Sequence, residues 1–196
     1  MRIISGQARR IQLKCIEGRD IRPTGDRVKE TLFSMLGPLD GLRILDLYAG
    51  TGALGLEALS RGAAQVVFVE REKKHAELLK QNLAAVAKAM GGIPDAAVRI
   101  INRDVRTFHQ GVPELAGVFD IILADPPYAT ATGEYGGTEL LQDAAFAAWA
   151  GTQAVLMLEH DAELLPPWAP LSHWKFCKNR QIGNTTLSFC KNPGSP

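Results

Sequence analysis

The chain has 196 residues, 46% of them hydrophobic, which suffices for one well-cored domain with a modest extension but not for two full domains. Its formal net charge is +1, and it lacks a signal-like or membrane-length apolar run, so we expect a soluble, cytoplasmic protein. The three cysteines form no CxxC pair and no His/Cys cluster has metal-ligand spacing, so we expect reduced thiols and no metal site.

The N-terminal part predicts a short strand or hairpin followed by a helix. The hairpin would use residues 2–4 and about 10–14, and the helix residues 25–36, where apolar side chains recur at helical spacing. Thr24 can cap this helix, and Gly37-Pro38 ends it.

Strands then alternate with helices, which is typical of a doubly wound α/β fold. The predicted strands cover residues 43–47, 65–70, 98–102, 119–124 and 154–159, and the predicted helices about 53–60, 72–89 and 138–150. Beyond Pro166-Pro167 the pattern changes. Residues 173–182 and 185–191, joined at Gly183-Asn184, predict a closing antiparallel hairpin, and residues 192–196 are expected to be disordered.

A glycine-rich turn, residues 50–55, follows the first strand of this alternation and opens a helix. Its GxGxxG pattern fits any nucleotide-like cofactor. Glu70 ends the next strand, where a carboxylate can bind both hydroxyls of a ribose. Asp46, before the glycines, suits an ammonium better than a phosphate, and Asp104 could receive an adenine amino group. Each acid alone is better explained as a helix cap or loop charge, but their coincidence at successive strand ends reverses this and favours S-adenosylmethionine over NAD.

The DPPY segment (Asp125-Pro126-Pro127-Tyr128) follows a buried strand. Neither proline has a backbone N–H, so the local surface can only accept hydrogen bonds. The Asp125 carboxylate and the Pro126 carbonyl can accept both hydrogens of an aromatic amine while Tyr128 stacks on its ring. The segment therefore predicts an amine site at a strand's carboxyl end, where ligands bind in open α/β sheets. The four residues fit guanine or adenine equally well.

These motifs resemble those of a known family. Residues 46–52 resemble the first motif of class I S-adenosylmethionine-dependent methyltransferases, and the DPPY segment resembles the fourth motif of those that methylate amino nitrogens. More narrowly, residues 1–6, Arg22-Pro23-Thr24 and residues 52–63 are similar to the bacterial small-subunit ribosomal RNA guanine-N2-methyltransferase family. The similarity extends to about residue 191. Ile182 departs from the family, which usually has an aromatic residue there.

The resemblance implies a Rossmann-like class I methyltransferase sheet of seven strands with the last one antiparallel. It also implies methylation of one guanine in 16S rRNA of an assembling 30S subunit, with S-adenosyl-L-methionine as the cofactor. We expect residues 1–38 to be an extension that contacts RNA and cofactor, residues 39–191 to be the methyltransferase domain, and the protein to be a monomer.

The expected site residues fall into three groups. The catalytic residues are Asp125, Pro126, Pro127 and Tyr128. The cofactor-binding residues are Asp46, Tyr48, Gly50, Thr51, Gly52, Glu70, Arg71, Asp104, Val105, Asp125, Arg22 and Thr24. The RNA-binding residues are Arg9, Arg10 and Lys14.

The charge distribution supports a polyanionic partner. Residues 1–30 carry eight basic and four acidic side chains, and residues 175–196 carry four basic and no acidic ones. Basic ends that flank an acidic centre favour RNA held at the edges of the site. A solvated charged surface explains the same pattern about as well.

Three other functions remain open at this point. The nearest alternative is another amino-methyltransferase, acting on adenine N6 in DNA or on a glutamine amide in a protein. The roughly 40 residues before the core are too few for a DNA-recognition domain, and the amide enzymes usually have Asn at the position of Asp125. An NAD-dependent oxidoreductase would explain the glycine turn but not the DPPY segment. A non-catalytic RNA-binding module would leave both intact motifs without a purpose.

Overall fold

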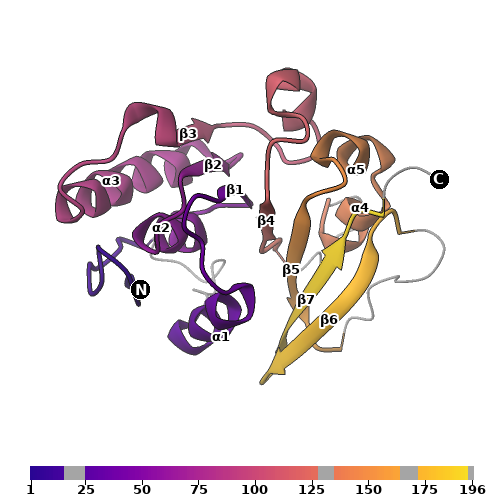
Figure 1. Cartoon of the computed structure of the whole chain (residues 1–196), viewed down its shortest axis with the longest axis horizontal. Coiled ribbons are helices and arrows are strands. Elements are labelled where there is room, and N and C mark those ends of the chain that lie inside the picture. Colours follow the sequence, from indigo (N-terminus) through magenta and orange to yellow (C-terminus); the bar gives the residue numbers. More distant parts are fainter. Residues whose placement is uncertain (16–24, 128–134, 164–171, 194–196) are drawn as a thin grey trace.

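The fold is a seven-stranded sheet in a computed structural model that describes residues 1–15, 25–127, 135–163 and 172–193. The strands are β1 (Arg43–Leu47), β2 (Gln65–Val69), β3 (Val98–Ile101), β4 (Ile121–Ala124), β5 (Val155–Asp161), β6 (Lys175–Ile182) and β7 (Thr185–Lys191). Their spatial order is β3-β2-β1-β4-β5-β7-β6, with β1 to β5 parallel and β7 antiparallel to both of its neighbours (Figure 1). This confirms the predicted doubly wound sheet with a closing hairpin.

Helices cover both faces of the sheet. They are α1 (Asp26–Leu36), α2 (Ala53–Ser60), α3 (Lys73–Ala89), α4 (Gly137–Gln142) and α5 (Ala144–Ala150), with 3-10 turns η1 (Asp95–Ala97), η2 (Phe108–Gly111) and η3 (Pro113–Leu115). The apolar side chains of α1, α2 and α3 pack into one core cluster, and those of α4, α5, η2 and η3 pack into another on the opposite face. The central parallel strands are thus buried on both faces, which explains their nearly continuous apolar sequences.

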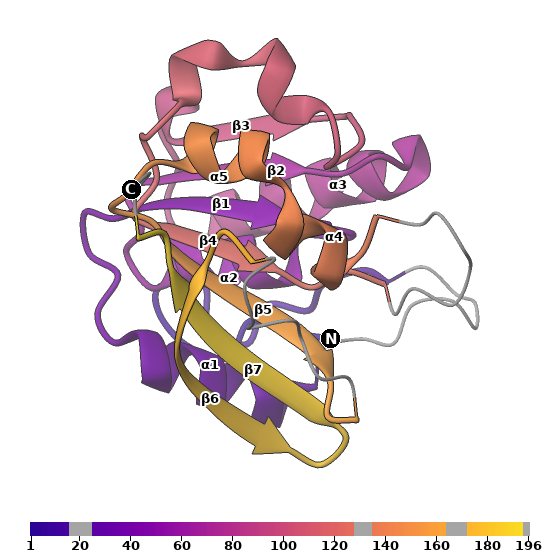
Figure 2. The same ribbon diagram turned by 90° about the vertical axis from the view of Figure 1, so that its right-hand side faces the viewer.

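The parallel strands all end at one edge of the sheet, here called the carboxyl edge. In Figure 2 the arrowheads of β1 and β5 point to this side. Asp46 in β1 pairs with Leu123 in β4, and Ala124 pairs with Leu158 in β5. The residues that follow β1, β2, β4 and β5 therefore lie along the same edge.

Two local predictions need correction. The single helix predicted over 138–150 is two helices, because Asp143 adopts an extended conformation and its carboxylate accepts the Phe146 N–H at 2.9 Å as the N-cap of α5. The N-terminal hairpin is one isolated antiparallel bridge between Arg2 and Gln12. Thr24, the expected cap of α1, lies outside the described residues, and Gly25 occupies the N-cap position without a side-chain bond.

The N-terminal segment is anchored on α2 by a buried carboxylate. Glu57 accepts the backbone N–H groups of Ile4 at 2.7 Å and Ser5 at 2.9 Å, and it pairs with Arg61 at 2.7 Å. Lys29 of α1 lies 3.7 Å from the same carboxylate with its side chain fully buried, and it also donates to the Arg2 carbonyl. These contacts join the expected extension to the core of the domain.

None of the helices within the described ranges is long and apolar enough to span a membrane.

Candidate active site

The glycine turn after β1 has a backbone that side chains would obstruct. Gly50 and Gly52 have φ of 54° and 87°, and a Cβ on Gly52 would lie 2.1 Å from Leu79 Cδ1. Only glycine fits this combination of positive φ and close packing. Tyr48, just before the turn, also has a positive φ of 55°, a conformation that costs a non-glycine residue about 1 kcal/mol or more. The turn therefore stores strain at the place where a cofactor would approach.

Glu70 follows β2 and is hydrogen-bonded to the glycine turn. Its carboxylate accepts the Gly50 N–H and the Glu72 N–H, both at 2.7 Å, and lies 3.6 Å from His75 Nδ1. A carboxylate has about four lone-pair positions, so two remain for other donors such as ribose hydroxyls. The side chain is held in place before any ligand binds.

Asp46 lies near the end of β1 and is almost fully buried. Its Oδ2 accepts the Gly55 N–H at 2.8 Å, which ties the strand to the first turn of α2. Burial raises the pKa of the Asp46 carboxyl to about 7, an effect opposed by the bond from Gly55 and reinforced by the negative charges of Asp125 and Glu70. Three carboxylates thus concentrate negative charge at one point of the carboxyl edge.

The remaining residues expected to bind the cofactor follow the ends of β3, β2 and β1. Asp104 is half-buried, and its carboxylate accepts the Arg106 N–H at 2.8 Å. Val105 is buried in the core beneath it. Arg71 is exposed and pairs with Glu72 at 3.4 Å. Thr51 is buried, with its carbonyl bonded to Asn82 at 2.9 Å.

The DPPY segment begins directly after β4. Asp125 is half-buried, Pro126 is buried and Pro127 is exposed. Because Asp46 pairs with Leu123, Asp125 lies two residues beyond Asp46 along the adjacent strand. The structure therefore brings the expected amine site next to the glycine turn. Tyr128, like the expected cofactor contacts Arg22 and Thr24, lies outside the described residues.

Two hydrogen bonds hold Tyr135, the first described residue after the DPPY segment. The Tyr48 hydroxyl donates to the Tyr135 carbonyl at 3.1 Å, and the Tyr135 hydroxyl donates to Asp143 at 2.6 Å. Burial raises the pKa of both tyrosine hydroxyls, so they remain donors at neutral pH. Tyr48 is thus a structural link between the glycine turn and the N-terminus of α5.

Sequence reasoning missed two buried polar residues near the site. Glu159 of β5 is the register neighbour of Asp125, because Ala124 pairs with Leu158, and it is 7% exposed. Asn82 of α3 accepts the Lys14 N–H at 2.8 Å and donates to the carbonyls of Lys14 and Thr51. The available signal was a polar residue at an apolar position: Glu159 at the end of a predicted buried strand, and Asn82 on the apolar face of a predicted helix.

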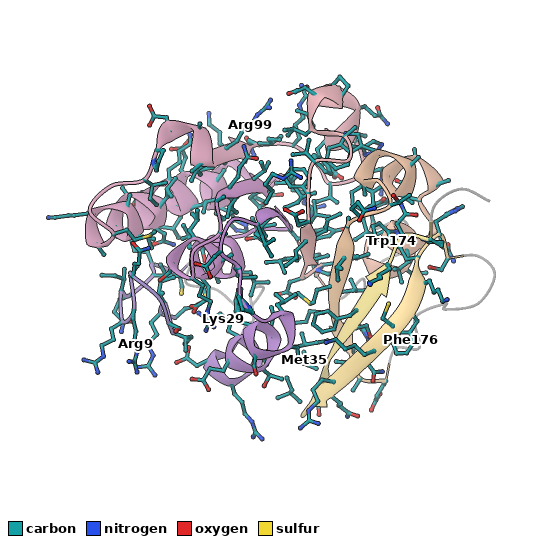
Figure 3. All side chains as sticks on the ribbon, in the orientation of Figure 1. Arg9, Lys29, Met35, Arg99, Trp174 and Phe176 are labelled. Carbon is teal, nitrogen blue, oxygen red and sulfur yellow. The ribbon has the colours of Figure 1, made fainter. Side chains whose placement is uncertain are left out.

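The three expected RNA contacts are dispersed. Gln7 and Ala8 bond to Ser60 at the far end of α2, which places neighbouring Arg9 and Arg10 about 12 Å along that helix from the glycine turn. Figure 3 shows Arg9 at the periphery, pointing away from the sheet. Lys14 lies closer to the site through Asn82, and its Nζ bonds Gln81 at 2.8 Å. The structure does not bring Arg9 and Arg10 to the carboxyl edge.

The chain is similar to ribosomal RNA methyltransferases along almost its whole length. A family model described as conserved hypothetical protein 95 matches residues 1–191. Ribosomal RNA small subunit methyltransferase D of Haemophilus influenzae is 32% identical over 195 residues, covering 98% of this chain and 94% of the relative. The protein of the same name from Escherichia coli K12 is 33% identical over 186 residues, covering 93% and 85%. The solved structure of Escherichia coli yhhF, described as a methyltransferase, has a TM-score of 0.75 at 28% identity and covers 100% of this chain and 99% of that chain.

Proposed function

Because the chain belongs to the conserved hypothetical protein 95 family, together with the ribosomal RNA small subunit methyltransferase D proteins, we propose that it methylates the N2 amino group of a guanine in small-subunit ribosomal RNA. The methyl donor is S-adenosylmethionine. The observation that carries the proposal is the adjacency of the glycine turn and the DPPY segment, on the neighbouring strands β1 and β4.

The glycine turn and its acids fit S-adenosylmethionine better than a phosphate-bearing cofactor. A pyrophosphate would meet the negative charge of Asp46, Glu70 and Asp125, whereas the sulfonium and ammonium of S-adenosylmethionine are attracted by it. Gly50 has no side chain, and the atom nearest to its Cβ position is the Tyr48 carbonyl oxygen at 3.9 Å, so the backbone there leaves room for the ligand to approach closely. We assign the ribose hydroxyls to Glu70, the ammonium to Asp46 and the adenine amine to Asp104.

The neighbouring carboxylates Asp125 and Glu159 favour guanine over adenine. The guanine edge presents two adjacent donor positions, N1–H and the N2 amine, and a flipped base is read through hydrogen bonds to this edge. Adenine presents an amine beside the bare N1 acceptor, which a second carboxylate would repel. Asp125 with the Pro126 carbonyl would hold the amine, and Glu159 would accept from N1–H.

The chain's contribution to the reaction is positioning and proton acceptance. S-adenosylmethionine supplies an electrophilic methyl group when bound. The guanine amine is a poor nucleophile because its lone pair is delocalised into the ring. Hydrogen bonds to Asp125 and Pro126 would fix the amine so that its lone pair faces the methyl, and they strengthen as positive charge develops on nitrogen. As the N–C bond forms and the S–C bond breaks, the amine proton passes to Asp125 or to water.

The proposal extends to the finer features of the substrate and to the state in which the protein acts. We propose that the target guanine lies in 16S rRNA of the assembling 30S subunit, and that the protein acts as a monomer in the cytoplasm. A loop guanine leaves its stack at little cost, which suits an enzyme that must reach a base edge.

The substrate class can be tested by label transfer. The purified protein is incubated with labelled S-adenosylmethionine and small subunits from cells that lack the enzyme, and the product is separated into RNA and protein. We expect label in 16S rRNA alone. Label in protein would favour the glutamine-methylating alternative, and binding of NADH but not S-adenosylmethionine by calorimetry would favour the oxidoreductase.

The preference for guanine can be tested with base analogues at the target position. Inosine lacks the N2 amine and should accept no methyl group. 2-Aminopurine keeps the amine but has no N1–H, so we expect it to react much more slowly than guanine. The Glu159→Gln variant should narrow the difference between guanine and 2-aminopurine. Equal rates on these two bases in the wild-type protein would contradict the role of Glu159.

A further inference from the structure

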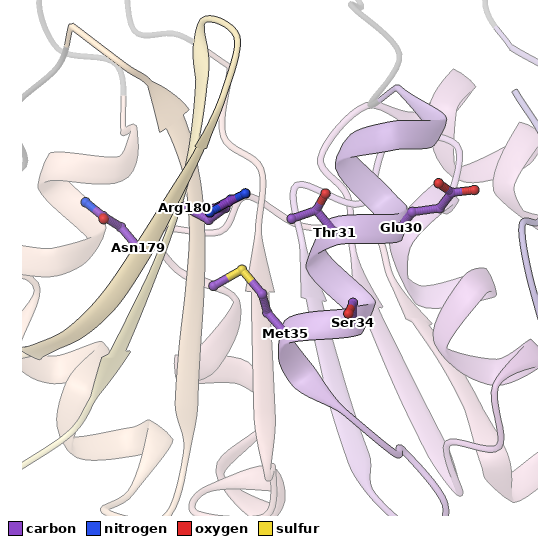
Figure 4. A pocket seen from close by; sticks show the side chains of 6 residues that line it. All are labelled: Glu30, Thr31, Ser34, Met35, Asn179 and Arg180. Carbon is purple, nitrogen blue, oxygen red and sulfur yellow. The ribbon is translucent and has the colours of Figure 1, made fainter.

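A groove of about 550 Å³ lies between α1 and the edge strand β6, outside the site described above (Figure 4). Its lining residues are Glu30, Thr31, Ser34 and Met35 of α1 and Asn179 and Arg180 of β6. The two walls come from opposite ends of the chain. The groove is open to solvent along its length, so it suits an extended ligand better than an enclosed small molecule.

The register of the sheet places Arg180 level with the DPPY segment. Asp125 is the register neighbour of Glu159, Glu159 pairs with Leu187, and Leu187 pairs with Arg180. These four residues form a row across β4, β5, β7 and β6. Leu187 belongs to the core cluster on the α1 face, and directly paired side chains point to the same face, so Arg180 faces the groove. Three strand spacings separate the ends of the row by about 14 Å.

Strand β6 is basic, and Arg180 is the cation that it contributes to the groove lining. β6 carries Lys175, Lys178 and Arg180 and no acidic residue, and residues 175–181 are all exposed. Glu30 is the one acid among the described residues that line the groove, and in Figure 4 its carboxylate points away from Arg180 toward the other side of α1. Thr31, Ser34 and Asn179 add neutral polar groups. This combination fits a negatively charged backbone with sugar hydroxyls.

Lys178 and Arg180, the two cations of β6 nearest to the groove, differ in whether their side chains already bind other residues. Lys178 Nζ donates to the Met35 carbonyl at 3.2 Å and lies 5.1 Å from the centre of the Phe189 ring, so it fastens α1 to the hairpin. The Arg180 guanidinium, in contrast, makes no hydrogen bond or ion pair to any residue within the described ranges. Lys178 thus holds the groove in shape, and Arg180 is available to a ligand.

We propose that this groove, called here the α1–β6 groove, holds the RNA backbone beside the flipped target nucleotide, with Arg180 bound to a phosphate. The inference rests on the proposed function, because it takes the target base to lie at Asp125. It names an RNA contact that neither the basic N-terminal residues nor the glycine turn supplies. Arginine suits the role, because its planar guanidinium can bind two phosphate oxygens at once.

The test compares variants in methyl transfer to small subunits from cells that lack the enzyme, over about 50 to 200 mM salt. Arg180→Gln should raise KM about tenfold with little change in kcat. The slope of log(kcat/KM) against log salt concentration should become less negative by about 0.7, as expected for one lost phosphate contact on single-stranded RNA. Arg180→Lys should keep the wild-type salt dependence and recover part of KM.

Arg99→Gln is the matched control, because it removes the same charge at the opposite edge of the sheet, on β3 (Figure 3). It should leave KM and the salt dependence unchanged. An equal effect of both variants would mean that only net charge matters, and an unchanged KM in Arg180→Gln would mean that the groove does not hold RNA. Either result overturns this inference alone. A wild-type protein that transfers no methyl to rRNA would instead overturn the proposed function.

Discussion

The two ends of the sheet treat their charged groups in opposite ways. Around the glycine turn, Asp46 and Glu70 are buried and already bonded to backbone N–H groups. On β6, the cations are exposed, and the Arg180 side chain makes no hydrogen bond or ion pair within the described residues. The first region is pre-organised for a ligand that is always the same, and such a site needs little rearrangement during reaction. The second is an adaptable surface suited to a polymer.

The largest expected effect tests whether the cofactor region and the amine site can be separated. Asp125→Ala removes one acceptor for the amine hydrogens but leaves the bonds that brace the glycine turn. We expect kcat to fall about a thousandfold, whereas the affinity for S-adenosylmethionine by calorimetry should fall only about threefold, because Asp46 and Glu70 keep their contacts with the cofactor. Asp125→Asn should retain more activity because it keeps a carbonyl oxygen. Loss of cofactor binding in Asp125→Ala would show that Asp125 is needed to bind the cofactor, so that the cofactor region and the amine site cannot be separated.

The anchor of the N-terminal segment on α2 should also lose stability when its buried carboxylate, Glu57, is removed. Glu57→Ala deletes the acceptor of Ile4 and Ser5 and leaves Lys29 buried without its counter-ion. We expect the free energy of unfolding to fall by about 3–5 kcal/mol in denaturant titration.

Two further variants sharpen this result. Adding Lys29→Met should restore part of the loss, because it removes the stranded charge. Glu77→Ala breaks an exposed helical pair with Lys80 and should change stability little. Similar destabilisation by Glu57→Ala and Glu77→Ala would contradict the anchoring role of Glu57.

The raised pKa of the Asp46 carboxyl predicts a pH dependence of cofactor binding. With a pKa of about 7, Asp46 is largely protonated below that pH, so the affinity for a cationic ligand should fall as pH decreases, by up to about tenfold per unit. Because the pKa in the folded protein lies above the ordinary value of 3.8, the same group makes the free protein less stable as pH rises from about 4 to 7. Calorimetry across this range checks the first effect. Asp46→Asn should flatten the profile, and an unchanged profile would mean that another group titrates.

The smallest effect concerns the link between the glycine turn and α5. Tyr48→Phe removes the hydrogen bond to the Tyr135 carbonyl but keeps the ring packing. We expect a loss of about 1 kcal/mol in thermal unfolding. Faster amide exchange around residues 135–146 should accompany it. A change confined to residues 43–50 would show that the link does not reach α5.

Local sequence signals predicted most of the sheet but not the contacts between distant segments. Strand periodicity and the glycine turn located β1 to β5, and the Gly183-Asn184 turn located the hairpin. The break at Asp143 was missed because a single residue in a helical apolar pattern can serve as either an interior position or a cap. Lys29 was one of the eight basic residues counted over residues 1–30, and its burial was not predicted, because burial of a lysine depends on partners such as Glu57 that lie far along the chain.

The same limit applies to the candidate site. The Asp46, Glu70 and DPPY positions follow from strand ends, which the sequence marks. The α1–β6 groove joins residues more than 140 positions apart, as the bond from Lys178 to Met35 shows. Only the strand order and register bring Arg180 level with Asp125.

The most direct test of the central claim is the identity of the methylated nucleoside. Small-subunit rRNA methylated in vitro is digested to nucleosides and analysed by mass spectrometry, with the Asp125→Ala protein as the blank. The account predicts N2-methylguanosine as the one new modified nucleoside with the wild-type protein and its near absence with the variant. N6-methyladenosine, or a methylguanosine modified at another atom, would contradict it.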